Sequence, residues 1–346
     1  IMGRNSRVSF LLALIMFPTL LFAQFNNNTS SPYSRFGMGE LSPNSFGRST
    51  AMGGASLASR YNLQINASNP ASYTAIDSLS FLFEFGIDSR FSNFQNDLGS
   101  TKTNNANFQY FAMSFQINNK IATSVGLVPF SDVGYSVDVF EHIDDEYVGD
   151  ILKKYYGVGT VSNAYIGLAV EPFKNVSIGA NLNYLFGKLN RNAEVYFLNS
   201  ADFYGVQQYA DFRLRDFGLD FGVQWTVPIK KDQHLVFAAV LENKPEYTTV
   251  FSDITKKNLT VGNVGDQDTL FSAENDKGSI KLPLTIGGGI SYVKDNSLEI
   301  NVDYFHQSWS DAKFNDSKSS FLTDLNKFAV GAEWIPNKFS IRSYLS

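Results

Sequence analysis

The chain has 346 residues, no cysteine, 15% aromatic and 18% charged residues, and a formal net charge of −5. The lack of cysteine excludes disulfides, Cys-ligated metal sites and cysteine nucleophiles, and the acidic balance argues against nucleic-acid binding. His142, His234 and His306 are too scattered to suggest a metal site. What remains is a chain rich in aromatics and poor in charge whose mean hydropathy is nevertheless only −0.13.

Residues 1–23 are typical of a signal peptide. Arg4 and Arg7 precede a nearly uninterrupted apolar run, and the small Ala23 precedes Gln24. The run is short and contains Pro18, which makes it a poor membrane span, although a retained anchor is the alternative. We expect cleavage after Ala23, and therefore an exported protein.

Residues 24–78 differ from the rest because they do not alternate. They contain a polar stretch at 26–31, a run of small residues at 51–58, and Asn69-Pro70-Ala71 near their end. Such residues are too small and polar to form a core of their own. We expect a leader followed by a hatch inside a barrel lumen; a periplasmic segment is the alternative.

From residue 79 onward, apolar residues recur at every second position. Strands are expected at about 79–90, 107–117, 121–140, 158–171, 176–190, 211–228, 234–250, 280–293, 298–309 and 326–335, with another starting near 339. In 217–225, for example, Phe217, Leu219, Phe221, Val223 and Trp225 alternate with Gly218, Asp220, Gly222 and Gln224. Period two places one kind of side chain on each face of a strand.

This pattern predicts an all-β fold, a transmembrane antiparallel β-barrel over residues 79–346. The apolar runs approach the roughly 9–11 residues that a strand needs to cross a bilayer. Long polar loops, expected at 91–106, 141–157, 191–210, 251–279 and 310–325, alternate with tight turns, as in outer-membrane barrels. A soluble sandwich would alternate too, but it has no reason to sort its loops by length. Because bacterial barrels have an even number of strands, we expect a truncated C-terminus.

Two short motifs carry a resemblance to a known family. Residues 47–55 read Gly-Arg-Ser-Thr-Ala-Met-Gly-Gly-Ala, and Asn69-Pro70-Ala71 stands just before the first strand. With the export signal, they resemble the FadL-type outer-membrane family, and within it the PorV-like branch. The resemblance implies a 14-stranded barrel, a hatch that includes Arg48, Gly53 and Gly54, and lateral exit of hydrophobic compounds at a kink in the third strand. About three strands would then follow the eleventh.

The third strand contains a break that suits such an exit. Pro129 cannot donate to a ladder, Phe130 follows it, and Gly134 permits a bulge. The alternative is that Pro129 marks where the strand leaves the membrane.

Parity places a set of carboxylates on the lumen face. The set consists of Glu84, Asp88, Asp220, Glu299, Asp303 and Glu333. Buried carboxylates need partners, so we expect the hatch arginines, Arg35, Arg48 and Arg60, to pair with them.

No catalytic arrangement, cofactor motif or metal-ligand spacing emerges, so we expect no enzyme, no cofactor and no metal site. The expected location is the bacterial outer membrane, where the barrel contacts lipid. The first functional hypothesis is passive uptake of a hydrophobic or amphipathic small molecule. The second is an accessory component that docks outer-membrane or periplasmic protein partners in secretion or membrane assembly.

Overall fold

A computed structural model describes residues 28–43, 45–78, 80–96, 99–145, 147–199, 203–243, 246–258, 267–294, 297–314, 317–318 and 322–336. The expected signal peptide, the cleavage site and the strand near residue 339 lie outside these residues. No helix in the described ranges is both long and apolar enough to cross a membrane.

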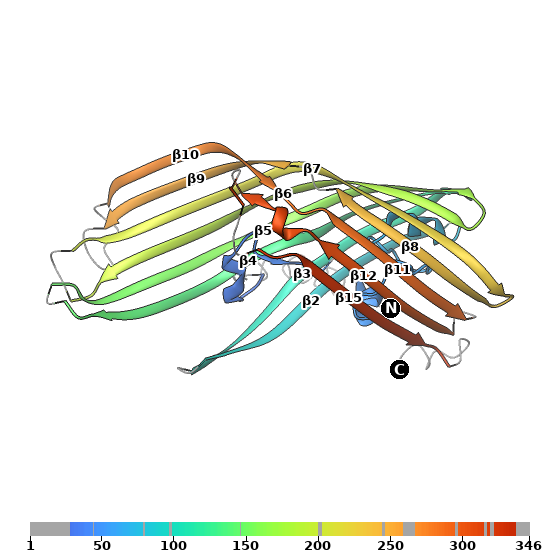
Figure 1. The fold of residues 1–346 in the computed structure, drawn as a ribbon, viewed down its shortest axis with the longest axis horizontal. Helices are drawn as coiled ribbons and strands as arrows, with labels where there is room; N and C mark the ends of the chain where they lie inside the picture. Colours follow the sequence, from blue (N-terminus) through green and yellow to red (C-terminus); the bar gives the residue numbers. More distant parts are fainter. Residues whose placement is uncertain are drawn as a thin grey trace, which may run out of the picture.

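Short elements occupy the N-terminal part of the described chain, and strands occupy the rest (Figure 1). The N-terminal elements are η2 (Pro32–Arg35), β1 (Glu40–Leu41), α2 (Gly47–Ala51) and η3 (Pro70–Ala75). They are followed by β2 (Phe81–Asn96), β3 (Gly99–Asn118), β4 (Ile121–Ile143), β5 (Gly149–Phe173), β6 (Val176–Phe197), β7 (Gly205–Lys230), β8 (Gln233–Asn243), β9 (Glu246–Asn258), β10 (Gln267–Lys281), β11 (Thr285–Lys294), β12 (Leu298–Gln307), η4 (Trp309–Asp311), β13 (Lys313–Phe314), β14 (Ser317–Lys318) and β15 (Leu325–Trp334).

All strands belong to one antiparallel sheet that curls into an open trough (Figure 1). The path that we call the main path is β2-β3-β4-β5-β6-β7-β8-β11-β12-β15, which contains ten of the 15 strands in the sheet; ten strands and the start of an eleventh were expected. A second path leaves β7: residues 219–230 of β7 pair with β8, and residues 205–214 pair with β9, which leads to β10, β13 and β14. Within the described residues, β2 and β15 form the two ends of the main path.

The outward face of the trough carries apolar side chains and the inward face carries small or polar ones, as the alternation predicts. Phe81, Phe83 and Phe85 of β2 are more than half exposed, and so are Phe328 and Trp334 of β15. Inward-facing residues of the same sheet are small or polar and largely buried, among them Ala112, Ser124, Asn181, Gln224, Asn301 and Asp303. An exposed row of this kind suits lipid, and the buried row is covered by the N-terminal part of the chain.

The predicted long loops are largely wrong. Strands continue through much of 91–106, 141–157, 191–210 and 251–279, and only the fifth range, 310–325, holds mostly short pieces. These extensions lie beyond the part of each strand whose outward side chains are apolar. There the outer face no longer needs hydrophobic side chains. Backbone pairing alone continues the sheet there, so period-two hydrophobicity does not reveal it.

Two predicted strands are each divided between two elements. The range 234–250 spans β8 and the start of β9, and 280–293 spans the end of β10 and most of β11. Leu282, Pro283 and Leu284 separate β10 from β11. Proline interrupts a ladder because it lacks the backbone donor, so Pro283 was an available signal for the second break.

Glycines on the inner face let the N-terminal part of the chain approach the wall closely. A Cβ on Gly179 of β6 would lie 2.5 Å from the carbonyl carbon of Pro70 and 2.7 Å from the nitrogen of Ala71. A Cβ on Gly289 of β11 would lie 2.9 Å from Leu57 Cβ. The backbone of η3 can therefore pack on β6 only because residue 179 has no side chain.

We expect Gly179→Ala to destabilise the folded protein by about 1–3 kcal/mol, as overpacking typically does. The matched control is Gly288→Ala, because the nearest atom to a Cβ there is 3.9 Å away. Urea unfolding in detergent micelles, followed by the gel shift between folded and unfolded barrel, measures both. Equal midpoints for the two variants would contradict this account of the packing.

Candidate functional site

The N-terminal segment, residues 28–78, lies on the concave face of the sheet. η3 contacts β5, β6 and β7, and Tyr73 within it is fully buried and donates to Asn181 Oδ1 at 3.0 Å. Phe46 stacks on Tyr110 of β3 with ring centroids 4.0 Å apart. The segment therefore packs against the sheet through both apolar and polar contacts.

The Asn69-Pro70-Ala71 motif builds the start of η3. Asn69 is the N-cap, and its Oδ1 accepts from the backbone nitrogen of Ala71 at 3.1 Å, while its Nδ2 donates to the carbonyl of Leu57 at 2.9 Å. Pro70 follows at the first helical position, which suits its fixed φ. All three residues are buried. The motif therefore joins η3 to the stretch around Leu57 and packs both against the wall.

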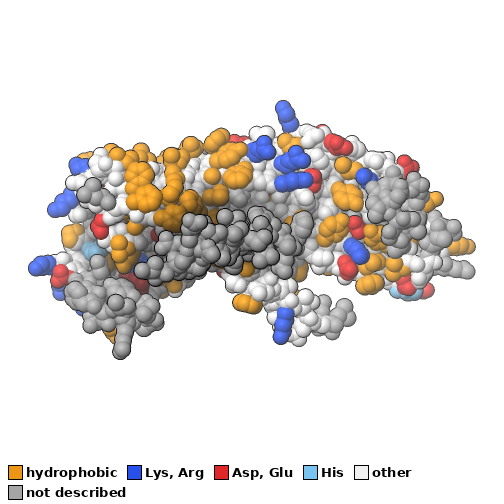
Figure 2. All heavy atoms as spheres, turned by 180° about the vertical axis from the view of Figure 1, so that it is seen from behind, with side chains coloured by type: hydrophobic (Ala, Val, Ile, Leu, Met, Phe, Trp, Pro, Cys, Tyr) orange, Lys and Arg blue, Asp and Glu red, His pale blue; other side chains and the backbone are white. Residues whose placement is uncertain are grey.

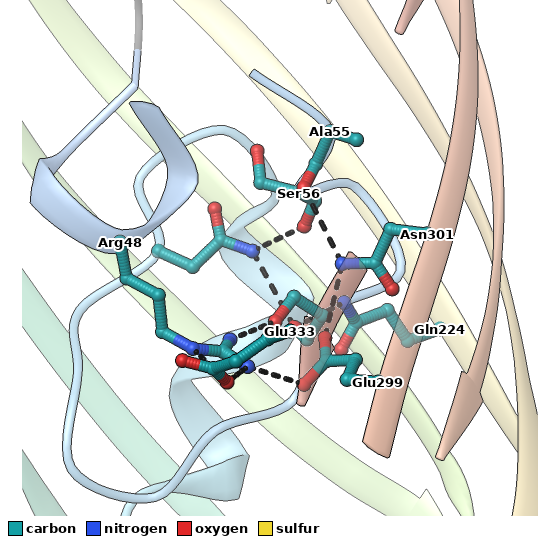
Figure 3. A network of polar contacts seen from close by, with 9 residues as sticks. Arg48, Ala55, Ser56, Gln224, Glu299, Asn301 and Glu333 are labelled. Atoms are coloured by element: carbon teal, nitrogen blue, oxygen red, sulfur yellow. Dashed lines mark hydrogen bonds and ion pairs between the residues drawn. The ribbon is translucent and has the colours of Figure 1, made fainter. Parts of the chain in front are cut away.

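Arg48 of α2 joins the segment to the far end of the sheet (Figure 3). Its Nη2 lies 2.6 Å from Glu299 Oε2 and also contacts Glu333 Oε2, to which its Nε donates at 3.0 Å. Burial disfavours a charged guanidinium, but the hydrogen bonds and charges of Glu333 and Glu299 outweigh it and raise the pKa of Arg48. Three charges from α2, β12 and β15 are thereby held together.

Arg60 and Arg35 are engaged differently from Arg48. Arg60 Nη1 donates to Ser177 Oγ at 3.0 Å and to Gln224 Oε1 at 2.9 Å. The guanidinium of Arg35 lies 5.1 Å from the ring centroid of Tyr155. The expected partnership with wall carboxylates thus describes the contacts of Arg48, whereas Arg60 and Arg35 contact neutral side chains and Glu171 acts on Arg60 only through its charge.

Three of the remaining inner carboxylates also bond to other groups. Asp303 is fully buried and accepts from the backbone nitrogens of Ser56 at 2.6 Å and Leu57 at 2.8 Å. Glu84 accepts from the backbone nitrogen of Ile65. Asp220 accepts from Asn183 Nδ2 at 2.6 Å, and Asp88 is partly exposed on β2.

Gly53 and Gly54 follow α2 with φ of +65° and +80°. Side chains rarely adopt this conformation, and a Cβ on Gly53 would lie 3.1 Å from the carbonyl oxygen of Val330 on β15. These two glycines allow the chain to turn immediately beside the wall.

β3 and β4 separate partway along their length. Their pairing ends at Phe111 and Leu127, although β3 begins at Gly99 and β4 runs to Ile143. On its other side β4 stays paired with β5, with one register shift between Pro129 and Ser131. In Figure 1, β2 and β3 diverge from β4 and the strands beyond it.

The N-terminal segment occupies the space where β3 and β4 part. β1 pairs with β4, with Glu40 opposite Asp132 and Leu41 opposite Ser131. The nitrogen of Ser42 donates to the carbonyl of Phe130 at 2.9 Å, and the nitrogen of Gly134 donates to Ser34 Oγ at 3.1 Å. All three residues singled out in the third strand, Pro129, Phe130 and Gly134, thus lie where the segment replaces β3 as the neighbour of β4.

Asn28 connects both sides of this space. Its Nδ2 donates to Asp132 Oδ1 and Thr160 Oγ1, each at 2.8 Å, and its carbonyl accepts from Asn107 of β3. The sequence did not single out Asn28, Leu41 or Asp132. Gly39 was a signal in the sequence that the chain turns close to the wall here. Its φ is +96°, and a Cβ at this position would lie 2.5 Å from the carbonyl oxygen of Asp132.

A cavity of about 330 Å³ lies between the segment and the wall. Leu41 and Pro43 line it from the segment, Pro129 and Phe130 from β4, and Trp309 from η4. Other lining residues include Val128, Leu185, Asp220, Glu242, Tyr247, Leu282 and Lys327. The cavity therefore combines apolar walls with a few charged groups and borders the β3–β4 separation.

Solved structures share this fold at low sequence identity. The P. putida toluene transporter TodX matches with a TM-score of 0.55 and 16% identity, over 85% of this chain and 81% of that one. A Pseudomonas aeruginosa FadL homologue matches with a TM-score of 0.51 and 11% identity, over 86% and 78%. No match is found among curated proteins.

At such identities the structural matches establish the fold alone, and they confirm the predicted FadL-type outer-membrane β-barrel. The apolar outer row, the buried polar inner row and this fold together place the protein in the bacterial outer membrane. A family model described as BamG matches residues 6–346. The chain therefore belongs to the BamG family.

Proposed function

We propose that the protein is a channel for passive uptake of hydrophobic or amphipathic small molecules across the outer membrane. The observation that carries the proposal is the cavity of about 330 Å³, which adjoins both the N-terminal segment and the broken pairing of β4. A compound held there would need only a shift of the segment to reach the side of the barrel. Two proteins of similar fold are a toluene transporter and a monoaromatic hydrocarbon channel.

The cavity suits an aromatic ring in size and chemistry. An apolar cavity of about 150 Å³ is already large enough to bind benzene, and small-molecule sites begin at roughly 300 Å³. Phe130, Leu185 and Trp309 supply apolar surface, and Lys327 and Asp220 supply polar contacts. An amphipathic ligand could place its ring against the first set and its polar atoms near the second.

In this proposal residues 28–78 are the hatch, and 28–42 are the part that moves. Residues 45–78 are fixed by buried contacts such as Tyr73 with Asn181 and Asp303 with the backbone of Ser56. Residues 28–42 meet β4 through the two-residue strand β1 and side-chain hydrogen bonds, and Met38 is buried in an apolar cluster with Val133 and Leu185. In this proposal, gating requires these contacts to break and form again together, as in the local opening of a segment.

Tethering β1 to β4 should therefore block uptake. Leu41 and Ser131 are directly opposed in the ladder, at a spacing that a disulfide can bridge, and the described chain has no free cysteine. In cells that carry Leu41→Cys with Ser131→Cys in the outer membrane, labelled toluene uptake should fall to the level of cells without the protein. A reductant should restore it.

The matched control is Val302→Cys with Val330→Cys, which are opposed in the β12–β15 ladder, exposed on the outer face, and far from β1 and β4 in the strand order. Its oxidation should leave uptake unchanged. Undiminished uptake through the oxidised Leu41–Ser131 tether would rule out exit beside β1.

Arg48→Glu should loosen the hatch, because it removes two ion pairs and places a third carboxylate beside Glu299 and Glu333. Breaking one side of a buried pair typically costs about 3–5 kcal/mol. We expect protease cleavage within residues 28–78 and a larger pore conductance in planar bilayers. Adding Glu333→Arg should restore part of the protection.

Lys153→Glu is the control for this charge reversal, because it disrupts an exposed ion pair with Glu141 instead. Its protease sensitivity and conductance should match the unaltered protein. If Arg48→Glu also matches it, the ion pairs do not hold the hatch.

One observation favours the second function, docking of a protein partner. β5 and β7 have 25 and 26 residues, well over twice the roughly 9–11 needed to cross a bilayer. The excess projects from the membrane as a broad sheet surface. A structure of the full protein extracted in mild detergent distinguishes the two functions, since bound small molecule favours uptake and a seated protein subunit favours docking.

A further inference from the structure

A group of cations lies on the outer face of β6 and β7. We call Lys188, Arg213 and Arg215 the outer basic group. Lys188 is directly opposite Arg213, and Arg215 is directly opposite Phe186. All three side chains are exposed. They continue the outward rows that contain Ile178 and Leu182 on β6 and Phe217 and Leu219 on β7, since neither strand has a register shift between these residues.

The group stands immediately beyond an aromatic cluster on the same two strands. The ring of Tyr184 lies 5.6 Å from that of Phe186 and 4.9 Å from that of Phe217. Aromatic side chains of this kind mark the membrane–water interface of barrels. The tight turns between β5 and β6 and between β7 and β8 lie at the other end of these strands, so the group is on the extracellular side. Figure 2 shows Lys and Arg side chains gathered next to hydrophobic ones on this molecule.

The charges in this group are not balanced. Lys188 pairs with Asp211 at 2.8 Å, which leaves two arginines in excess over the carboxylates of the group. Like charges directly opposite in a ladder are unfavourable, yet Lys188 faces Arg213. The excess is also contrary to the formal net charge of −5 for the whole chain. A bound anion at the interface would remove the repulsion.

A second cluster, of tyrosines, lies farther out on the same face. Tyr156 and Tyr196 each donate to Glu194 at 2.8 Å, and Tyr209 donates to Gln207 at 2.6 Å. Tyr156 and Tyr209 are both opposite Asn192, so they occupy one row across β5, β6 and β7. Because their hydroxyl groups are held by neighbours, the rings are fixed as a partly exposed aromatic surface.

We propose that the outer basic group binds the phosphates of a glycolipid in the outer leaflet, and that the tyrosine cluster contacts its sugars. Arginine is suited to phosphate through paired hydrogen bonds. Proximity to lipid-facing aromatics favours a lipid headgroup over free phosphate. The acyl chains of the lipid would lie along Phe217 and the apolar residues that follow it in the outward row of β7. The proposal is independent of uptake, since it uses the opposite face of the sheet from the cavity.

The test measures retention of a phosphorylated disaccharide lipid by the full chain in detergent, using native mass spectrometry. Arg213→Glu with Arg215→Glu should weaken binding roughly tenfold or more, as expected for losing two charge-assisted contacts. The matched control is Lys230→Glu with Lys231→Glu, the same change in charge at the β7–β8 turn, which should bind like the unaltered protein. Arg213→Lys with Arg215→Lys should retain part of the affinity.

Comparison with other probes identifies the source of the anion. The same lipid without phosphates should bind at least as weakly as the Glu variant, and inorganic phosphate at equal concentration should not displace the lipid. Equal binding by the two Glu variants, equal binding of the dephosphorylated lipid, or displacement by inorganic phosphate would each overturn the proposal. The heat-dependent gel shift verifies that every variant is folded.

Discussion

The structure depends on one constraint, which is that a sheet in lipid must satisfy its backbone hydrogen bonds within the protein. Along most of the trough each strand does this by pairing with two neighbours. The pairing of β3 with β4 ends at Phe111 and Leu127, and there the N-terminal segment supplies partners. Ser42 donates to the carbonyl of Phe130, and Ser34 accepts from the nitrogen of Gly134. At this point the N-terminal segment thus takes the place of β3 beside β4, and elsewhere it packs against the inner face of the sheet.

The same segment resolves the problem of buried charge on the inner face. A carboxylate taken out of water is costly unless it is paired or hydrogen-bonded. Asp303 accepts two backbone N–H groups from residues 56 and 57, and Glu299 shares Arg48 with Glu333. For these carboxylates the wall supplies the acceptors and the segment supplies the donors, so wall and segment need each other. This reciprocity explains why polar residues survive on strands whose other face is strongly apolar.

Much of the architecture could be predicted from period-two alternation, because lipid imposes that period directly. The ten strands of the main path and the outward position of Phe81 or Phe328 follow from it. The pattern fails where the outward side chains are no longer apolar, and there β9 and β10 pair through polar residues such as Asp253 and Asp268. Pairing there depends on backbone geometry, to which composition gives no clue. Tyr184 and Phe186 lie where the apolar outward row of β6 ends. Beyond them the outward side chains are mostly polar.

The inner face shows a similar division between what sequence can and cannot reveal. Parity predicts that Glu84, Glu299 and Asp303 face the concave side, and in the structure each of them bonds to the N-terminal segment. Which group each carboxylate meets depends on how residues 28–78 fold in three dimensions, and short motifs such as Asn69-Pro70-Ala71 specify only local turns. Arg48 and Arg60 are equivalent in sequence terms, yet one meets two carboxylates and the other meets Ser177 and Gln224.

The average hydropathy of the chain conceals two surfaces with opposite chemistry. On the outer face, greasy rows give way to Lys188, Arg213 and Arg215 where the aromatic side chains end. On the inner face, small and acidic residues contact the segment that closes the gap beside β4. Most of the wall is secured by hydrogen bonds between strands that do not involve the segment, whereas beside β4 residues 40–42 themselves supply backbone partners. A movement of residues 28–42 would therefore release hydrogen bonds of β4 and leave the rest of the wall paired.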